Sequence, residues 1–272
     1  MKRALFVVFC IIAVCSLLAV PLLLQPAPAP TPPDALQRAV AKAIDFESRE
    51  PDDPYALLMH DVMHRRFGIA EFADALQRYD QILAENPDGA PLLRVFRRIA
   101  DHDNPLQAGD LEELWHEGDR LIVPALYCDR MGLPHDYPAM LQQAANLGDY
   151  MLPHVLLAWI WIQENGCEVP LPDGFIDAVY SANAALIGND QVVDELELEA
   201  AAFLHLAGQG ALVDDAFVER VIEAQNADGG WLPSSDTPGV SYWHTTILGL
   251  MLLLHVEYPA DSYPPMLAPA SP

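Results

Sequence analysis

Apolar residues recur at helical spacing along most of the chain. In residues 33–50, for example, Leu36, Val40 and Ile44 fall on one face of a helix, with Asp34 as a cap at its start. Strands would show sustained alternation of polar and apolar residues with β-branched side chains, and no stretch shows that pattern. The hydrophobic pattern therefore predicts an all-α fold.

Helix boundaries are marked by capping residues, prolines and glycines. Asp53 and Pro54 form the start expected of a helix that stops at Gly68, and the next helix ends at Asn86 and Pro87. Further helices are predicted within residues 90–105 and over residues 108–117, 119–131, 137–147, 149–165, 174–187, 192–207, 214–226 and 240–257. Because the connectors are short, successive helices should pack antiparallel as hairpins.

Three of these helices are apolar along almost their whole length. They begin near Pro153, Glu195 and His244, at intervals of 40 to 50 residues, and each follows a shorter amphipathic helix. This faint repeat indicates stacked or closed helical hairpins in which the apolar helices form an inner layer.

The N-terminus carries an uninterrupted apolar run of 21 residues, Ala4 to Leu24, directly after Met-Lys-Arg. A membrane span needs about 20 apolar residues, whereas a cleavable signal has an apolar core of about 7 to 15. Positive charge before the run keeps that end in the cytoplasm. We therefore expect residues 1–24 to form a transmembrane anchor. A cleaved signal sequence ending at Ala29 and a lipidated Cys15 are the alternatives.

The anchor defines the expected organisation of the rest of the chain. A proline-rich linker, residues 25–35, leads to an exported helical domain, residues 36–260, with a helical-repeat half (36–132) and a second half (133–260). A proline-rich tail, residues 261–272, follows. The protein is thus expected to be a single-pass protein of the inner (cytoplasmic) membrane, with its domain in the periplasm or on the extracellular side. Its first expected partner is the membrane itself.

Acidic residues outnumber basic ones by 39 to 14, which gives a formal net charge of −25. A surface of that sign repels phosphate backbones. No nucleic-acid partner is therefore expected.

Two of the four cysteines, Cys128 and Cys167, lie in the exported part of the chain. An oxidising environment there permits a disulfide. A bridge requires that the two Cα atoms come close, which sequence does not show, so one disulfide and two buried thiols both stay open.

The stretch QNADGGW contains five residues of one motif: Gln225, Asp228, Gly229, Gly230 and Trp231. The Asp-Gly-Gly sequence forms a turn where a helix must stop, and the tryptophan offers a large apolar face that can hold the loop. The motif resembles the glutamine–tryptophan repeat of the α/α-toroid superfamily, which includes protein prenyltransferase β-subunits and the squalene/terpene cyclases. The resemblance covers roughly residues 214–257. It implies a toroid-like arrangement of hairpins, partial or open, in the second half of the domain.

The same resemblance extends to Tyr242, Trp243 and His244, where an aromatic-His-Thr sequence opens an apolar helix. In prenyltransferases this histidine is a zinc ligand, so the match makes His244 a candidate metal ligand. The Asp-x-Cys pair that completes that zinc site and the Asp-x-Asp-Asp motif of the cyclases are both missing. No cofactor is therefore predicted, and zinc is the alternative. Because His244 stands at the mouth of its helix, we expect it to lie near a central cavity, and Tyr242, Trp243 and Glu199 are further candidates for the cavity lining.

Other polar motifs have simpler explanations. His60 and His64 share one helical face and could chelate a metal, but no third ligand is identifiable, so an exposed polar face is expected. Acidic clusters such as Asp214 and Asp215 fall where helices start or end, and are expected to be caps. Residues 73–96 are similar to a single tetratricopeptide repeat, which is compatible with a binding scaffold.

Taken together, these features predict a membrane-anchored, extracytoplasmic helical-repeat protein that acts as a ligand-binding or interaction module. The expected ligand is a protein or an apolar small molecule. The alternative is an enzyme of the toroid superfamily, prenyltransferase/cyclase-like or active on glycans, that uses a cavity near His244.

Overall fold

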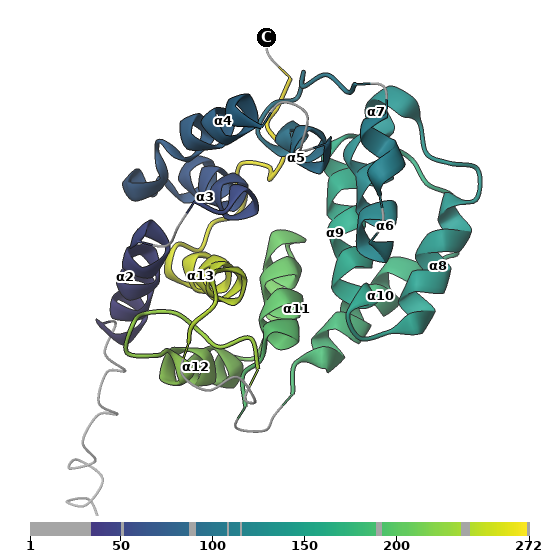
Figure 1. The fold of residues 1–272 in the computed structure, drawn as a ribbon. Coiled ribbons are helices and arrows are strands. Elements are labelled where there is room, and N and C mark those ends of the chain that lie inside the picture. The colour runs from purple at the N-terminus through teal and green to yellow at the C-terminus, as the bar shows by residue number, and fades with distance from the viewer. Residues whose placement is uncertain are drawn as a thin grey trace, which may run out of the picture. The chain divides into compact units, whose positions relative to one another are not determined.

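The structure is a computed structural model, and it describes residues 34–49, 52–86, 91–107, 109–114, 116–188, 192–234 and 240–270. All regular elements in these ranges are helices, and none is a strand, so the all-α prediction is confirmed. No helix in these ranges is both long and apolar enough to cross a bilayer. The predicted anchor, residues 1–24, and the linker up to residue 33 lie outside the described residues. The last two residues assigned to the linker belong to the first helix in Figure 1.

The α-helices are α2 (Asp34–Arg49), α3 (Pro54–Phe67), α4 (Ala75–Glu85), α5 (Pro91–Phe96), α6 (Glu117–Leu126), α7 (Cys128–Met131), α8 (Tyr137–Leu147), α9 (Met151–Glu164), α10 (Phe175–Leu186), α11 (Glu195–Leu206), α12 (Asp215–Ala224) and α13 (Trp243–Glu257). Short 3₁₀ turns occupy Ala70–Phe72, Arg97–Ile99, Asp110–Glu113 and Gly210–Leu212.

Helix ends follow the capping chemistry of the sequence. The Asp53 side chain accepts hydrogen bonds from the backbone N–H groups of Tyr55 and Ala56, and Gly68 ends α3 with a φ of 73°. At the start of α11, Asp194 and Glu197 form a reciprocal capping box. The caps predicted at Asp53 and Gly68 are thus confirmed.

The helices form an inner and an outer layer (Figure 1). Neighbours in the inner layer follow the order α3, α13, α11, α9 and α6, whereas α4 packs on α3, α8 on α9, and α10 on both α9 and α11. α3 comes from the first half of the domain and α13 from the second. The two halves therefore pack into one unit, and they meet where α3 packs on α13 and where α6 packs on α9.

The Gln225–Trp231 turn attaches α2 to the last hairpin. The Gln225 amide donates to the backbone oxygens of Ala39 in α2 and of Gly229 in the turn itself. Gly229 has a φ of 103°, and a Cβ there would lie 2.3 Å from the Lys42 carbonyl oxygen. This position therefore requires glycine both for its backbone conformation and for the close approach of α2.

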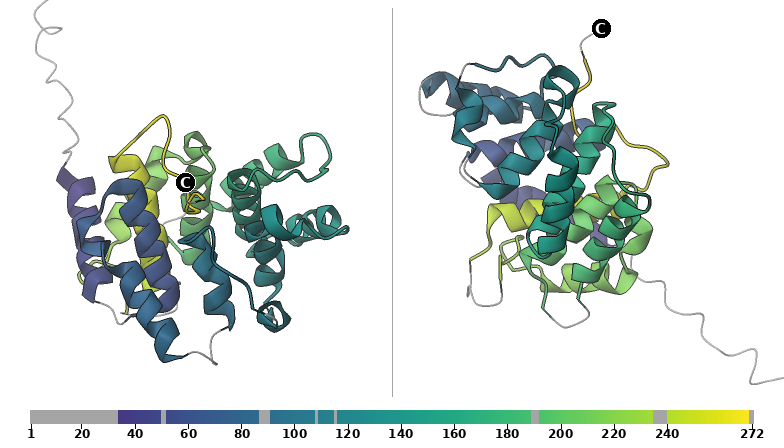
Figure 2. Two further views of the ribbon diagram at one scale, coloured as in Figure 1. Left: turned by 90° about the horizontal axis from the view of Figure 1, so that it is seen from above. Right: turned by 90° about the vertical axis from the view of Figure 1, so that its right-hand side faces the viewer.

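The C-terminal residues cross the inner helices after α13, in the loop visible in Figure 2. The Glu164 carboxylate accepts hydrogen bonds from the backbone N–H groups of Met266 and Leu267, and Arg65 donates to the carbonyl of Met266. Met266 and Leu267 are buried. The described part of the proline-rich tail is thus packed on α3 and α9.

Two predicted helices differ from the structure. Of the predicted helix 108–117, the described residues 109–114 form a 3₁₀ turn, because the buried Asp110 side chain is held by Arg94 and by the backbone N–H of Gln107, and Glu117 already belongs to α6. The predicted helix 119–131 is divided at Tyr127, whose hydroxyl donates to the carbonyl of Val95. In both cases tertiary hydrogen bonds override the local helical pattern.

The prediction of an exposed face at His60 and His64 is wrong. His60 is 4% exposed, and its ring nitrogen lies 3.0 Å from the Glu47 carboxylate of α2. His64 is partly buried and is bonded to the Ile69 carbonyl. α3 is covered by α2, α4 and α13, so it has no broad solvent face.

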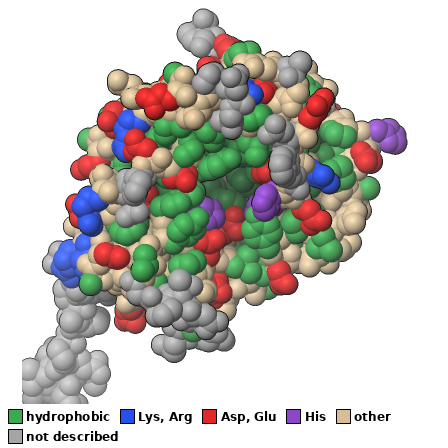
Figure 3. Space-filling model, in the orientation of Figure 1, with side chains coloured by type: hydrophobic (Ala, Val, Ile, Leu, Met, Phe, Trp, Pro, Cys, Tyr) green, Lys and Arg blue, Asp and Glu red, His purple; other side chains and the backbone are tan. Residues whose placement is uncertain are grey.

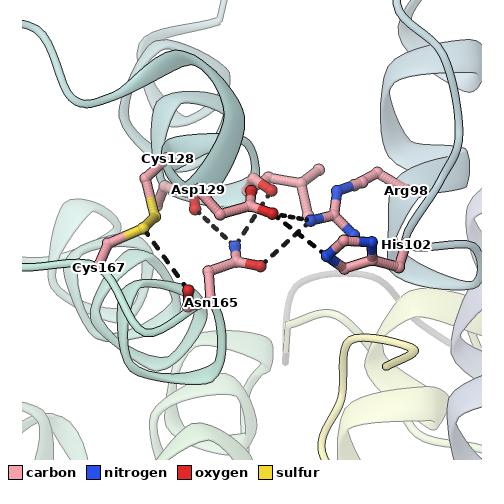
Figure 4. The surroundings of a disulfide bond; sticks show 8 residues. Arg98, His102, Cys128, Asp129, Asn165 and Cys167 are labelled. Carbon is pink, nitrogen blue, oxygen red and sulfur yellow. Dashed lines mark hydrogen bonds and ion pairs between the residues drawn. A yellow bond between two sulfur atoms is a disulfide. The ribbon is translucent and has the colours of Figure 1, made fainter. Parts of the chain in front are cut away.

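Cys128 and Cys167 form a disulfide that links the start of α7 to the loop after α9 (Figure 4). Beside it, the buried Arg98 guanidinium donates to Asp129 and Asn165, and the Asn165 amide donates to the carbonyls of α6. The disulfide and this polar cluster connect α6, α7 and the end of α9.

Removing the disulfide in a Cys128→Ala/Cys167→Ala variant is expected to lower the free energy of unfolding by about 4 kcal/mol, because the two cysteines are 39 residues apart and the bridge restricts the unfolded chain. Urea denaturation of the oxidised protein and of the variant measures the difference. Reduction of the native protein with dithiothreitol serves as the matched control. Equal midpoints before and after reduction would show that the bridge adds no stability.

Candidate functional site

A cavity of about 560 Å³ lies between the inner helices. Its apolar walls include Leu58 and Met59 of α3, Ile122 of α6, Leu157 and Trp161 of α9, Phe203 of α11, and Ile247, Leu248 and Met251 of α13. Met266 of the C-terminal segment also lines it. Figure 3 shows a central hollow lined by apolar side chains, with histidine and acidic side chains along one edge.

The polar edge of the cavity contains a pair formed by His244 and Glu195. His244 Nδ1 lies 3.2 Å from Glu195 Oε1, and the Thr245 hydroxyl donates to Glu195 Oε2 over 2.5 Å. His244 belongs to the first turn of α13, and Glu195 is the first residue of α11. Since α11 and α13 pack side by side, the pair joins the starts of two neighbouring inner helices.

The environment favours the charged form of both partners. Burial alone would lower the pKa of His244, but the hydrogen bond and charge of Glu195, with the charge of Glu199, raise it above its ordinary value. Burial alone would raise the pKa of Glu195, but hydrogen bonds from His244 and Thr245 lower it. The two side chains are 35% and 33% exposed, so solvent screens part of their attraction.

Glu199 lies one helical turn after Glu195 on the same face of α11. It lines the cavity and is 6% exposed. Burial raises its pKa to about 7; the positive charge of His244 opposes this rise, and the negative charge of Glu195 adds to it. Glu199 can therefore hold or release a proton near neutral pH, inside an otherwise apolar space.

A second set of polar residues, from α6, its N-cap and α9, faces the cavity. His154 Nδ1 is bonded to the Tyr150 carbonyl, and burial lowers the pKa of His154. A Cβ on Gly118 of α6 would lie 2.5 Å from the His154 ring, so glycine at this position leaves room for the imidazole. His116 and Asp119 line the same wall.

All four residues expected at the cavity line it: Tyr242, Trp243, His244 and Glu199. The five residues of the QNADGGW motif do not line it. Trp231 is instead buried between α12 and α13, where its indole N–H donates to the Val221 carbonyl. Its backbone carbonyl accepts from the Tyr242 N–H, so the turn holds the start of α13 beside the cavity.

Sequence reasoning missed His154 as a cavity residue, although a signal for it was present. The three apolar helices of the faint repeat begin near Pro153, Glu195 and His244. The structure places polar residues from all three starts, His154 among them, around the cavity and its edge. The starts of the three apolar helices thus lie at the same end of the inner layer.

The donor set at this edge does not fit a zinc site. Within the described ranges, no three His, Cys, Asp or Glu side chains are grouped so that they could hold a metal ion. His244 has one carboxylate partner, Glu195, and His60 and His64 have separate partners. We therefore interpret the polar residues at this edge without a bound metal ion.

Comparison with protein-family models, with curated proteins and with solved structures gives no match for this chain.

The raised pKa of Glu199 predicts a specific pH dependence of stability. Between its ordinary value of 4.5 and about 7, the folded protein keeps a proton that the unfolded chain has lost. The contribution of Glu199 to stability therefore falls as pH rises through this window, by about 3 kcal/mol for a shift of this size, and levels off above it. The isosteric variant Glu199→Gln should lack this loss and should be more stable than the native protein at pH 8.

Urea denaturation at pH 5, 6, 7 and 8 measures the effect. Glu219→Gln, the same substitution at an exposed position of α12, is the matched control and should follow the native pH profile. If Glu199→Gln and native protein run parallel from pH 5 to pH 8, the carboxyl is not protonated in the folded state.

Proposed function

We propose that this protein binds an apolar small molecule in the cavity between its inner helices. The observation that carries this proposal is a cavity of about 560 Å³ whose walls are mostly aliphatic and aromatic side chains. Pockets of this size and composition, with a few polar groups at one place, are typical of small-molecule sites. The polar groups here lie at one edge, so they would orient the ligand, and the apolar walls would enclose its body.

The toroid-like arrangement expected from the QNADGGW motif belongs to this proposal. Its support is the layered order of α3, α13, α11, α9 and α6 around the cavity, with α4, α8 and α10 outside them (Figure 1). The expected location outside the cytoplasm is likewise supported by the Cys128–Cys167 disulfide, because such bridges persist in oxidising compartments.

An enzyme that transfers protons is the alternative function. It is favoured by one observation: Glu199, with a pKa of about 7, stands in the cavity near the His244–Glu195 pair. A general acid or base works best with a pKa close to the working pH. Binding is preferred because the described lining of the cavity contains no Ser, Thr, Cys or Lys side chain, and the described residues contain no group of three metal ligands.

Filling the cavity tests the proposed function. Met59 is half-buried and lines the cavity from α3, so Met59→Trp adds a large side chain to the ligand space without displacing the core. Binding of the neutral apolar dye N-phenyl-1-naphthylamine, followed by fluorescence titration, should weaken at least tenfold. The matched control is Met131→Trp, at a methionine of α7 that is 57% exposed and lies outside this cavity.

Equal dye affinity in Met59→Trp, Met131→Trp and native protein would place the binding elsewhere and would reject the cavity as the ligand site. Circular dichroism of the three proteins checks that the variants keep their helical content.

A further inference from the structure

The described residues that line the cavity include no Lys and no Arg. They do include two acidic residues, Asp119 of α6 and Glu199 of α11, and Glu195 stands beside them at the edge. The histidine of the pair, His244, has Glu195 as its own counter-ion. When Glu195 and Glu199 are both ionised, they carry two negative charges, and the protonated His244 carries one positive charge. One negative charge is therefore left uncompensated.

That uncompensated charge belongs to Glu199. No hydrogen bond or ion pair links its carboxyl to any other described residue, although the side chain is 6% exposed and lines the cavity. The neighbouring acids of α11 differ, because Asp194 and Glu197 cap the helix and Glu195 binds His244 and Thr245. The Glu199 carboxyl therefore faces the cavity, and a ligand that supplies a donor or a positive charge would give it a partner.

Aromatic side chains surround the same edge. Tyr55, Tyr150, Tyr242 and Trp243 all line the cavity, and the Tyr242 and Trp243 rings lie 5.5 Å apart. Aromatic faces attract cations, and they do so more strongly where water is excluded. Acidic and aromatic groups together therefore favour a cation over a neutral or anionic group.

We propose that the polar edge of the cavity binds the ammonium group of a ligand with an apolar body, with Glu199 as its counter-ion. This inference rests on the proposed function, and it adds the chemical class of the ligand. The ammonium group lies against Glu199 and the aromatic rings, and the body of the ligand extends along the apolar walls of α3, α9 and α13. An anionic group in the same place would face Asp119, Glu195 and Glu199 without a lysine or arginine to bind it.

Three probes with one chain length separate the head-group preference from apolar binding: octyltrimethylammonium, 1-octanol and octanoate. Their affinities for the full chain are measured at pH 8 by isothermal titration calorimetry, below the concentrations at which they form micelles. The expected order is ammonium first, at least tenfold tighter than the alcohol, with octanoate weakest. The permanent charge of the trimethylammonium group excludes titration of the probe itself.

The variants assign the preference to one residue. Glu199→Gln should lower the affinity for octyltrimethylammonium about tenfold and leave the affinity for octanol within twofold of native. Glu219→Gln, with the same loss of charge on the exposed face of α12, should leave the affinities for all three probes unchanged. The contrast separates a local contact from the general attraction of an acidic protein for cations.

Different results reject different claims. If octanol binds and octyltrimethylammonium binds no more tightly, or if Glu199→Gln and Glu219→Gln weaken ammonium binding equally, the ammonium site is wrong while the apolar ligand site stands. If none of the three probes binds, the proposed function fails, and the ammonium site fails with it.

Discussion

The structure depends on three inner helices, α9, α11 and α13, that have almost no polar face. In α13 every residue from Thr245 to His255 is buried, and α9 and α11 are nearly as apolar. A helix of this kind must be covered on all sides, because its exposed surface would otherwise order water around apolar groups. Outer helices cover one side. The other sides face the remaining inner helices and the cavity, so the apolar cavity follows directly from the composition of these helices.

The QNADGGW turn acts on the site through the position of α13. Trp231 fills the space between α12 and α13, and Gly249 permits its close contact, since a Cβ there would lie 3.0 Å from the indole ring. Thr246 accepts a hydrogen bond from the Trp231 N–H, two residues after His244. Gln225 joins the same turn to α2. A motif that looks functional is thus structural, and it fixes where His244 meets α11.

The acidic residues at the start of α11 are neighbours in the sequence, but they have different roles in the structure. Asp194 and Glu197 satisfy the free N–H groups of the helix start, and Glu195 pairs with His244. Glu199, one turn later, has no such partner and faces the cavity. Position relative to the helix end decides these roles, because only residues in the first turn can reach the unpaired backbone groups. Asp53 and Asp214 are N-caps, as expected, whereas their neighbours Asp52 and Asp215 make no cap bond, and Asp52 pairs with Arg78.

Local signals in the sequence were sufficient for the helical class, for most helix boundaries, for the caps at Asp53 and Gly68, and for the turn before Trp231. These features depend on periodicity, backbone conformation and groups a few residues apart, which a sequence contains directly. The sequence also pointed to Glu199 and His244, because both lie near the starts of apolar helices. Only the tertiary structure decided three features: the pairing of His60 with Glu47, the 3₁₀ turn at Asp110, and the pairing of His244 with Glu195. Each of them joins residues from different elements. Whether a polar group finds such a partner depends on its burial among packed helices, and no local sequence pattern contains that information.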